Sequence, residues 1–106
     1  MKVNELKSLE NGIRKDIYNY IVKNPATFLA EIKRALNISS STAMWHLKIL
    51  ENSGLIKSKK FGNRLHYFSS EIPEEEYITF LIERNKKIKD IINYLKEEKE
   101  AYLKKN

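Results

Sequence analysis

ISSSTAMWHLKILENSGLIKSKKFGNRLHYF, residues 38–68, holds two local patterns that together suggest an architecture for the whole chain. Serines precede an apolar-periodic run that stops at Gly54, and two short basic segments flank Gly62 and Asn63. Serine is a favoured residue at a helix N-cap, and glycine commonly follows the last helical residue. A Gly-Asn pair between two strand-like segments indicates a tight hairpin. The stretch therefore predicts a helix over about residues 40–53, capped by Ser39, and a hairpin over about residues 55–69.

The predicted helix of residues 40–53 has an apolar face and a polar face. Ala43, Leu47 and Leu50 recur at helical spacing, so we expect them in the core. The remaining positions of its first turns are expected to face outward, and they are Ser40, Ser41, Thr42, Met44, Trp45 and Lys48.

Two more helices are predicted upstream. Asn11 is a candidate cap for a helix of about 12 residues that ends at Asn24-Pro25, because the residue before proline avoids the helical region. Thr27 is expected to cap a second helix, FLAEIKRAL, which Asn37 closes in a left-handed conformation. A short turn then leads to the helix of residues 40–53. This is the helix-turn-helix arrangement, in which the second helix enters the major groove of DNA.

A single long helix is predicted from Pro73 to about Leu103, with three glutamates in its first turn. Its apolar residues are spaced alternately three and four apart, as in a two-stranded coiled coil. We therefore predict a mainly α fold with a small β-hairpin (α+β), divided into residues 1–72 for DNA binding and residues 73–106 for dimerisation. The predicted dimer seam consists of Ile78, Leu81, Asn85, Ile88, Ile92, Leu95 and Tyr102.

The charge of the chain is uneven. The net charge is +6, and residues 39–70 hold five basic residues against one acidic residue, whereas residues 71–106 hold eight against nine. A basic patch of this kind favours a polyanionic partner. No cysteine and no long apolar run occur, so we expect a cytoplasmic protein without disulfides and without membrane contact. Nothing has the spacing of metal ligands or of a catalytic motif, and we expect no metal, no cofactor and no enzyme activity.

Three segments resemble the winged helix-turn-helix regulators of the ArsR type, especially archaeal ones. They are SLENGIRKDIYNYIVKNP, FLAEIKRALNISSSTAMWHLKILENSGLI and KSKKFGNRLHYF, and the resemblance covers about residues 9–70. The resemblance implies a homodimer whose recognition helix contacts the major groove while the hairpin, or wing, contacts the DNA backbone. Metal sensing through cysteines does not carry over, since this chain has none. The residues that correspond to DNA-contacting positions are Ser40, Ser41, Thr42, Met44, Trp45, Lys48, Lys57, Lys59, Lys60, Asn63 and Arg64.

Several residues allow two interpretations. Trp45 and Met44 either pack against the wing or a partner, or contact thymine methyl groups, sugars or base edges. His46 is interpreted as a hydrogen-bonding support, and His66 as a wing residue within reach of phosphate. The wing lysines either solubilise a sheet edge or bind phosphates.

The leading hypothesis is a homodimeric transcriptional regulator that binds an inverted-repeat operator in double-stranded DNA, with or without an effector. A second hypothesis is a protein-interaction module within a larger transcription or chromatin assembly. A third is a binder of single-stranded nucleic acid that stacks bases on Trp45, Phe61 and Tyr67.

Overall fold

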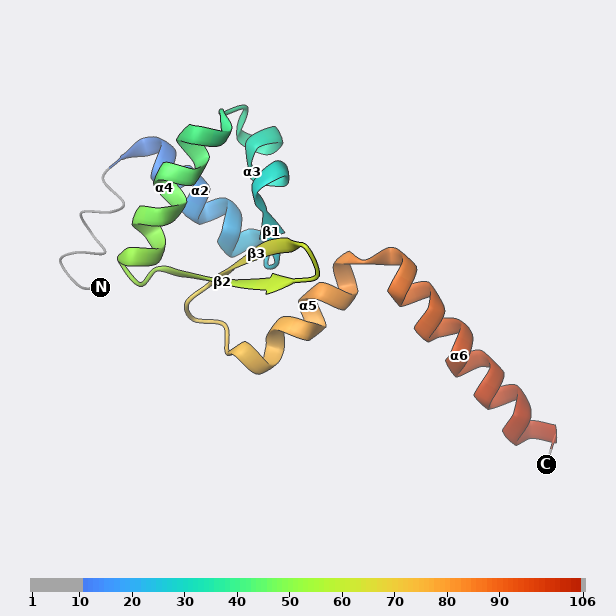
Figure 1. Ribbon diagram of the computed structural model, residues 1–106. Helices are drawn as coiled ribbons and strands as arrows, with labels where there is room; N and C mark the ends of the chain where they lie inside the picture. The colour runs from blue at the N-terminus through green and yellow to red at the C-terminus, as the bar shows by residue number, and fades with distance from the viewer. Residues whose placement is uncertain (1–10, 106) are drawn as a thin grey trace. The chain divides into compact units, whose positions relative to one another are not determined.

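A computed structural model of the chain describes residues 11–105, although not the side chains of residues 86–89 and 105. The chain divides into two compact units, Met1–Glu74 and Glu75–Asn106. Figure 1 shows the elements along the chain. In order, they are α2 (Gly12–Lys23), β1 (Thr27–Phe28), α3 (Leu29–Leu36), α4 (Ser40–Asn52), β2 (Ile56–Phe61), β3 (Arg64–Ser69), the 3-10 helix η1 (Glu74–Glu76), α5 (Tyr77–Arg84) and α6 (Lys86–Lys105).

The ends of α2, α3 and α4 follow the predicted capping residues. The Asn11 side chain accepts a hydrogen bond from the Arg14 backbone N–H, and Ser39 Oγ accepts one from Thr42 N–H, each at 3.2 Å. Asn37 closes α3 with φ 54° and ψ 52°, and Gly54 follows α4 with φ 79°. These short-range predictions are confirmed because each depends on residues within one turn of the helix end.

The predicted cap of α3 is wrong. Phe28 occupies the N-cap position without a side-chain hydrogen bond, whereas Thr27 lies in strand β1 and is fully buried. The Thr27 hydroxyl instead donates to Glu31 Oε1 at 2.7 Å. Thr27 pairs with Tyr67, which is distant in sequence, and this pairing places the backbone of Thr27 in the sheet. A local pattern cannot reveal such a partner.

The β structure is a sheet of three strands in the order β1-β3-β2, with both pairs antiparallel. The predicted hairpin is confirmed, since β2 and β3 are joined by Gly62 and Asn63, and Gly62 has φ 63°. A Cβ-bearing residue rarely adopts this positive φ, so glycine suits the turn. The third strand, β1, was not predicted, because its two residues are too few to show an alternating pattern.

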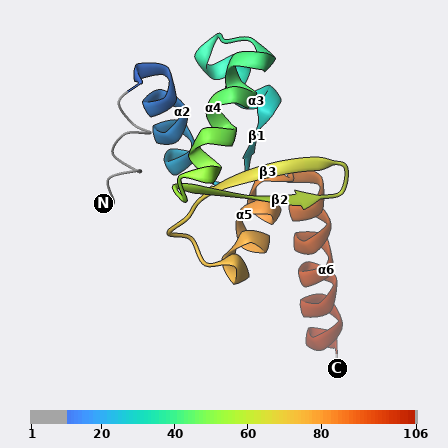
Figure 2. The same ribbon diagram turned by 60° about the vertical axis from the view of Figure 1, so that its left-hand side comes forward.

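The helices α2, α3 and α4 pack together and against the sheet (Figures 1 and 2). Ala43, Leu47 and Leu50 are buried as predicted, and they form the inner face of α4. The core cluster also takes residues from α2, α3, the sheet and the turn before β2, namely Ile17, Ile21, Ile32, Leu55, Ile56 and Tyr67. This packing leaves the opposite face of α4 exposed.

The prediction of one continuous C-terminal helix is wrong. Asn85 has φ −94° and ψ 92°, which are not helical, and it separates α5 from α6. Asparagine is a weak helix former because its side chain competes for backbone hydrogen bonds. The predicted seam is therefore divided between two helices, and the side chain of Ile88 lies outside the described residues.

Candidate nucleic-acid interface

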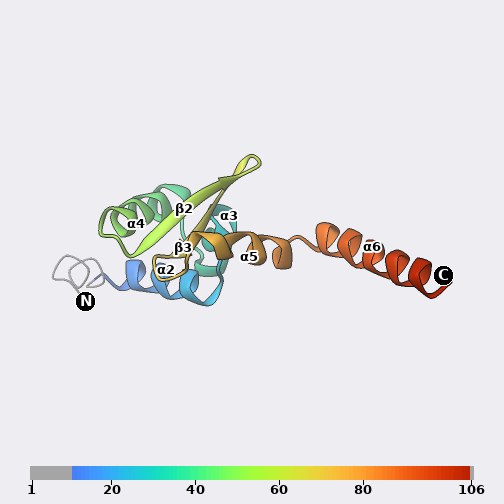
Figure 3. The same ribbon diagram turned by 90° about the horizontal axis from the view of Figure 1, so that it is seen from below.

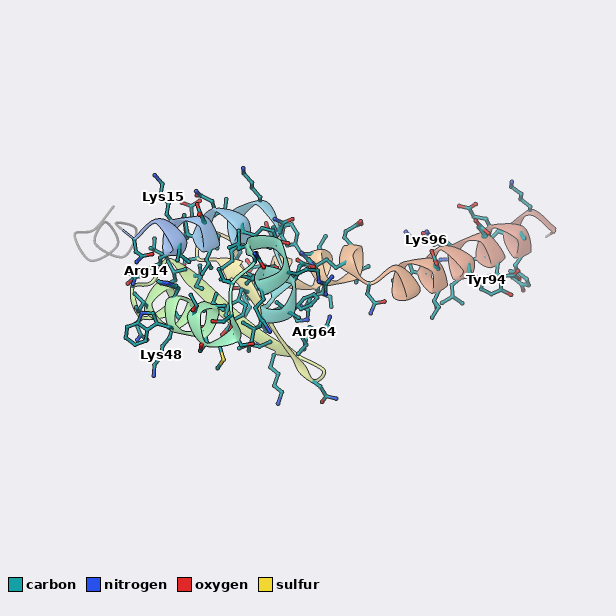
Figure 4. All side chains as sticks on the ribbon, turned by 90° about the horizontal axis from the view of Figure 1, so that it is seen from above. Arg14, Lys15, Lys48, Arg64, Tyr94 and Lys96 are labelled. Carbon is teal, nitrogen blue, oxygen red and sulfur yellow. The ribbon has the colours of Figure 1, made fainter. Side chains whose placement is uncertain are left out.

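The outward face of α4 is a ridge of exposed side chains. Ser41, Met44, Trp45 and Lys48 are all exposed, and their spacing of three and four residues places them on one side of the helix. Met44 is 57% exposed and Trp45 is 63% exposed, so the wing does not cover them. Figure 4 shows Lys48 pointing away from the body of the domain, on the side opposite Lys15 of α2.

The hydroxyl groups at the start of α4 already bond to one another. Ser39 Oγ donates to Thr42 Oγ1 at 2.9 Å and lies 3.2 Å from Ser41 Oγ. Ser40 and Thr42 are half-buried. Part of this cluster therefore stabilises the cap, and Ser41 is the most accessible hydroxyl among the three predicted contact residues.

His46 supports α4 from its inner side, as predicted. The ring is buried, and its Nδ1 accepts a hydrogen bond from Arg14 Nε of α2 at 3.2 Å. Burial and, to a lesser extent, the Arg14 charge lower the pKa of His46 below its usual 6.5. The neutral imidazole is the form that can accept this bond, so the contact joins α4 to α2 at neutral pH.

The wing divides its cations between two faces of the sheet. Side chains alternate along a strand, and residues paired across antiparallel strands share a face. The register places Lys57 and Lys59 on the same face as Arg64, whereas Lys60 lies on the face to which α2 and α4 contribute the core. The sequence grouped these four residues as one set. Figure 3 shows the tip of the β2–β3 hairpin, which carries the turn residues Gly62 and Asn63, projecting beyond the helices α2, α3 and α4.

Lys59 is engaged in an ion pair. Its Nζ lies 2.7 Å from Glu74 Oε1, and both side chains are more than half exposed. The hydrogen bond from Lys59, followed by its charge, lowers the pKa of the Glu74 carboxyl. Because the pair is exposed, its contribution to stability is small and is screened by salt.

Arg64 lies over an aromatic ring. Its guanidinium carbon is 3.8 Å from the centroid of the Phe28 ring, a cation–π geometry. Phe28 in turn meets the edge of the His66 ring, with the centroids 5.9 Å apart and the planes at 77°. Figure 4 labels Arg64 on the hairpin.

The predicted phosphate contact by His66 is wrong. The ring is buried, and Nδ1 lies 2.7 Å from the carbonyl oxygen of Ala26, to which it donates. Ala26 has a positive φ of 72° and its N–H donates to Tyr67 at 3.0 Å. His66 is therefore a structural residue that helps to hold a strained turn against the central strand.

The aromatic surface required by the single-stranded hypothesis does not form. Tyr67 is 8% exposed and belongs to the core cluster, whereas Trp45 and Phe61 are exposed on separate elements.

Sequence reasoning also missed Arg14, Phe28 and Glu74 as partners of site residues. The sequence shows that Arg14 and Glu74 are charged, but it does not indicate that they contact His46 and Lys59.

The part of the chain that the structure describes contains neither a candidate membrane span nor a metal-binding cluster. No helix there is both long and apolar enough to cross a membrane. Nor do those residues bring together three or more histidine, aspartate or glutamate side chains that could hold a metal ion.

Known proteins share the sequence pattern of this interface. Residues 10–57 match the family described as winged helix-turn-helix DNA-binding. A Methanocaldococcus jannaschii protein named as an uncharacterized HTH-type transcriptional regulator, MJ1398, is 45% identical over 93 residues, which are 88% of this chain and 24% of that protein. This chain thus spans about a quarter of the length of that curated relative.

Solved structures share the fold. HlyU from Vibrio cholerae has a TM-score of 0.60 at 25% identity, over 76% of this chain and 84% of HlyU. The homodimeric winged helix-turn-helix DNA-binding domain of Mb0332 from Mycobacterium bovis, a possible ArsR-family regulator, has a TM-score of 0.60 at 24% identity, over 74% of this chain and 70% of that domain. The matching family is a DNA-binding family and not an enzyme family, as the sequence indicated. Residues 10–57 of this chain therefore match the winged helix-turn-helix DNA-binding family, and the solved structures share the winged helix-turn-helix fold that the sequence predicted.

Proposed function

We propose that this chain is a sequence-specific regulator of transcription that binds double-stranded DNA as a homodimer. The observation that carries the proposal is the solvent-exposed outward face of α4, where Lys48 lies beside exposed Met44 and Trp45. A helix of 13 residues with one buried face and one exposed face is suited to a major groove.

The wing supplies the contacts to the phosphate backbone. Lys57, Lys60, Asn63 and Arg64 are all exposed on β2, β3 or the turn between them. Lys59 joins them when phosphate replaces Glu74 as its partner. Each phosphate that a cation neutralises contributes about 0.9 to the slope of log affinity against log salt.

Dimerisation is assigned to α6. Leu95 is 59% exposed and Tyr102 is 67% exposed, and Ile91 lies on the same side of the helix. Such an apolar stripe on a helix of 20 residues is long enough for a two-stranded interface. The solved Mb0332 domain is described as homodimeric, which supports the same assembly here. A dimer would place two recognition helices about 34 Å apart, so the operator would be an inverted repeat.

The test is fluorescence anisotropy with the full chain and labelled duplexes from the region upstream of its gene, titrated against unlabelled non-specific DNA. Saturable binding that survives the competitor, with two chains per duplex, is expected. Lys48→Ala should weaken binding to the selected site about tenfold and general binding much less, because Lys48 lies on the groove-facing helix. Lys60→Ala should weaken both alike and lower the salt slope by about 0.9.

The dimer is tested separately by sedimentation equilibrium. Leu95→Glu should shift the chain from dimer to monomer, whereas Lys96→Glu, one residue along the same helix, should leave the dimer intact. If the wild-type chain is monomeric and recovers one stoichiometric protein partner without binding any selected duplex, the interaction-module hypothesis replaces the one proposed.

A further inference from the structure

Met44 and Trp45 are exposed where a DNA-reading helix needs its specific contacts. Both side chains are more than half exposed, and neither packs on the inner face of α4, which is formed by Ala43, Leu47 and Leu50. Leaving a large apolar side chain in water is unfavourable in proportion to its exposed area. A bound surface that removes these two side chains from water would therefore gain affinity.

Residues 40–48 of α4 lack most of the long polar side chains that recognise bases. Guanine is commonly read by arginine or lysine, adenine by asparagine or glutamine, and cytosine by aspartate or glutamate. Residues 40–48, SSTAMWHLK, contain none of these except Lys48, and His46 is buried. The C5-methyl group of thymine is the one base-edge feature of the major groove that apolar side chains contact.

We propose that the recognition helix reads thymine methyl groups through Met44 and Trp45, and that its half-sites are A·T-rich. This inference rests on the DNA-binding function proposed above and names the class of sequence that the same helix selects. Thymine methyl groups line the major groove and are themselves apolar, so they complement the two side chains without any hydrogen bond.

A DNA groove fits this face better than an apolar protein surface does. Lys48 lies between Met44 and Trp45 on the helix surface, and its charge would be desolvated in an apolar interface. Residues 39–70 carry five basic side chains against Glu51 alone. Apolar contacts surrounded by cations match a groove whose floor carries methyl groups and whose rims carry phosphates.

The test begins with selection of a binding site from duplexes with a randomised core of about 20 base pairs, enough for two half-sites one turn apart. Each thymine of the selected site is then replaced, one at a time, by deoxyuridine, which pairs identically and lacks only the methyl group. We expect one or two thymines per half-site at which the replacement weakens binding about fourfold, the effect of losing one buried methyl group.

Variants identify the side chains that contact the methyl groups. Met44→Ala and Trp45→Ala should each bind the thymine and deoxyuridine duplexes equally well at one of these positions. Val22→Ala removes an exposed apolar side chain from α2 and should keep the fourfold difference of the wild-type chain.

The outcomes separate the two proposals. A selected site rich in G·C pairs, or deoxyuridine effects below about 1.5-fold at every thymine, overturns thymine readout and leaves sequence-specific DNA binding intact. Selection that enriches no duplex overturns the DNA-binding proposal itself.

Discussion

The recognition helix α4 and the β2–β3 wing differ in how their outward side chains are held. On α4, Met44, Trp45 and Lys48 are exposed beside a well-packed inner face. On the wing, Lys59 is paired with Glu74 and Arg64 lies over Phe28. The outward side chains of α4 can therefore contact DNA without losing an interaction within the protein. Two of the wing cations, Lys59 and Arg64, either give up an intramolecular partner or keep it when DNA binds.

The difference indicates separate contributions to binding. A side chain already engaged within the protein gains less from a phosphate, because the lost interaction offsets part of the new one. It is also better ordered beforehand, which lowers the entropy lost on binding. We therefore expect α4 to determine which sequence is bound, and the wing to adjust affinity and its salt dependence.

The largest effect is expected on the buried side of α4. Leu47→Ala should lower the free energy of unfolding by about 2–5 kcal/mol, because the side chain is almost fully buried and its removal leaves a cavity. Met44→Ala, on the opposite face, should change it by less than about 0.5 kcal/mol. Urea denaturation followed by circular dichroism measures both. Equal effects would show that α4 does not have the two distinct faces described.

The next effect concerns the ring beneath Arg64. Phe28→Leu should weaken binding of the selected duplex about two- to fivefold, because Arg64 loses the ring that orders it before DNA binds, and an exposed cation–π contact is worth about 0.5–1 kcal/mol. Phe28→Tyr keeps the ring and should restore the wild-type affinity. Anisotropy titrations measure all three proteins. Tighter binding by Phe28→Leu would mean that the ring withholds Arg64 from DNA.

A pH effect is expected at the contact between α4 and α2. The pKa of His46 is lowered in the folded chain, so the unfolded chain binds the proton more readily. The free energy of unfolding should therefore fall as the pH decreases below about 6.5 towards the folded pKa, and should stay constant with respect to this group above it. Urea denaturation at pH 7.5 and 5.5 measures the change.

His46→Asn is the matched variant for this measurement. Asparagine offers an oxygen near the position of Nδ1 to Arg14 and does not titrate, so the difference between the two pH values should be smaller than in the wild type. An identical difference in both proteins would assign the pH dependence to another group.

The smallest effect is expected at the exposed ion pair of the wing. Glu74→Gln removes the charged partner of Lys59 and should strengthen DNA binding, by less than about threefold at low salt, since exposed charges are screened. Glu75→Gln removes the same charge one residue away and should have a smaller effect. Anisotropy at several salt concentrations compares them, and weaker binding by Glu74→Gln would contradict a competition between Glu74 and phosphate.

Local features of the chain were predictable because their causes are local. The caps Asn11 and Ser39, the left-handed Asn37 and the turn at Gly62 each depend on neighbouring residues, and the inner face of α4 depends on helical spacing alone. The winged helix-turn-helix could be inferred because these signals occur in the required order.

Features that join distant segments were decided by the tertiary structure. Thr27 lies in strand β1 because it pairs with Tyr67, which is far away in sequence. The buried ring of His66 donates a hydrogen bond to the carbonyl oxygen of Ala26, which is also distant in sequence. The division of the wing cations followed from strand register, in which a shift of one residue exchanges the two faces. By itself the sequence determined which side chains were available on α4 and the wing. The packing determined which of these side chains are exposed to solvent and which contact another side chain of the protein. Burial and pairing depend on groups that are far apart in the chain, so the sequence alone could not show them.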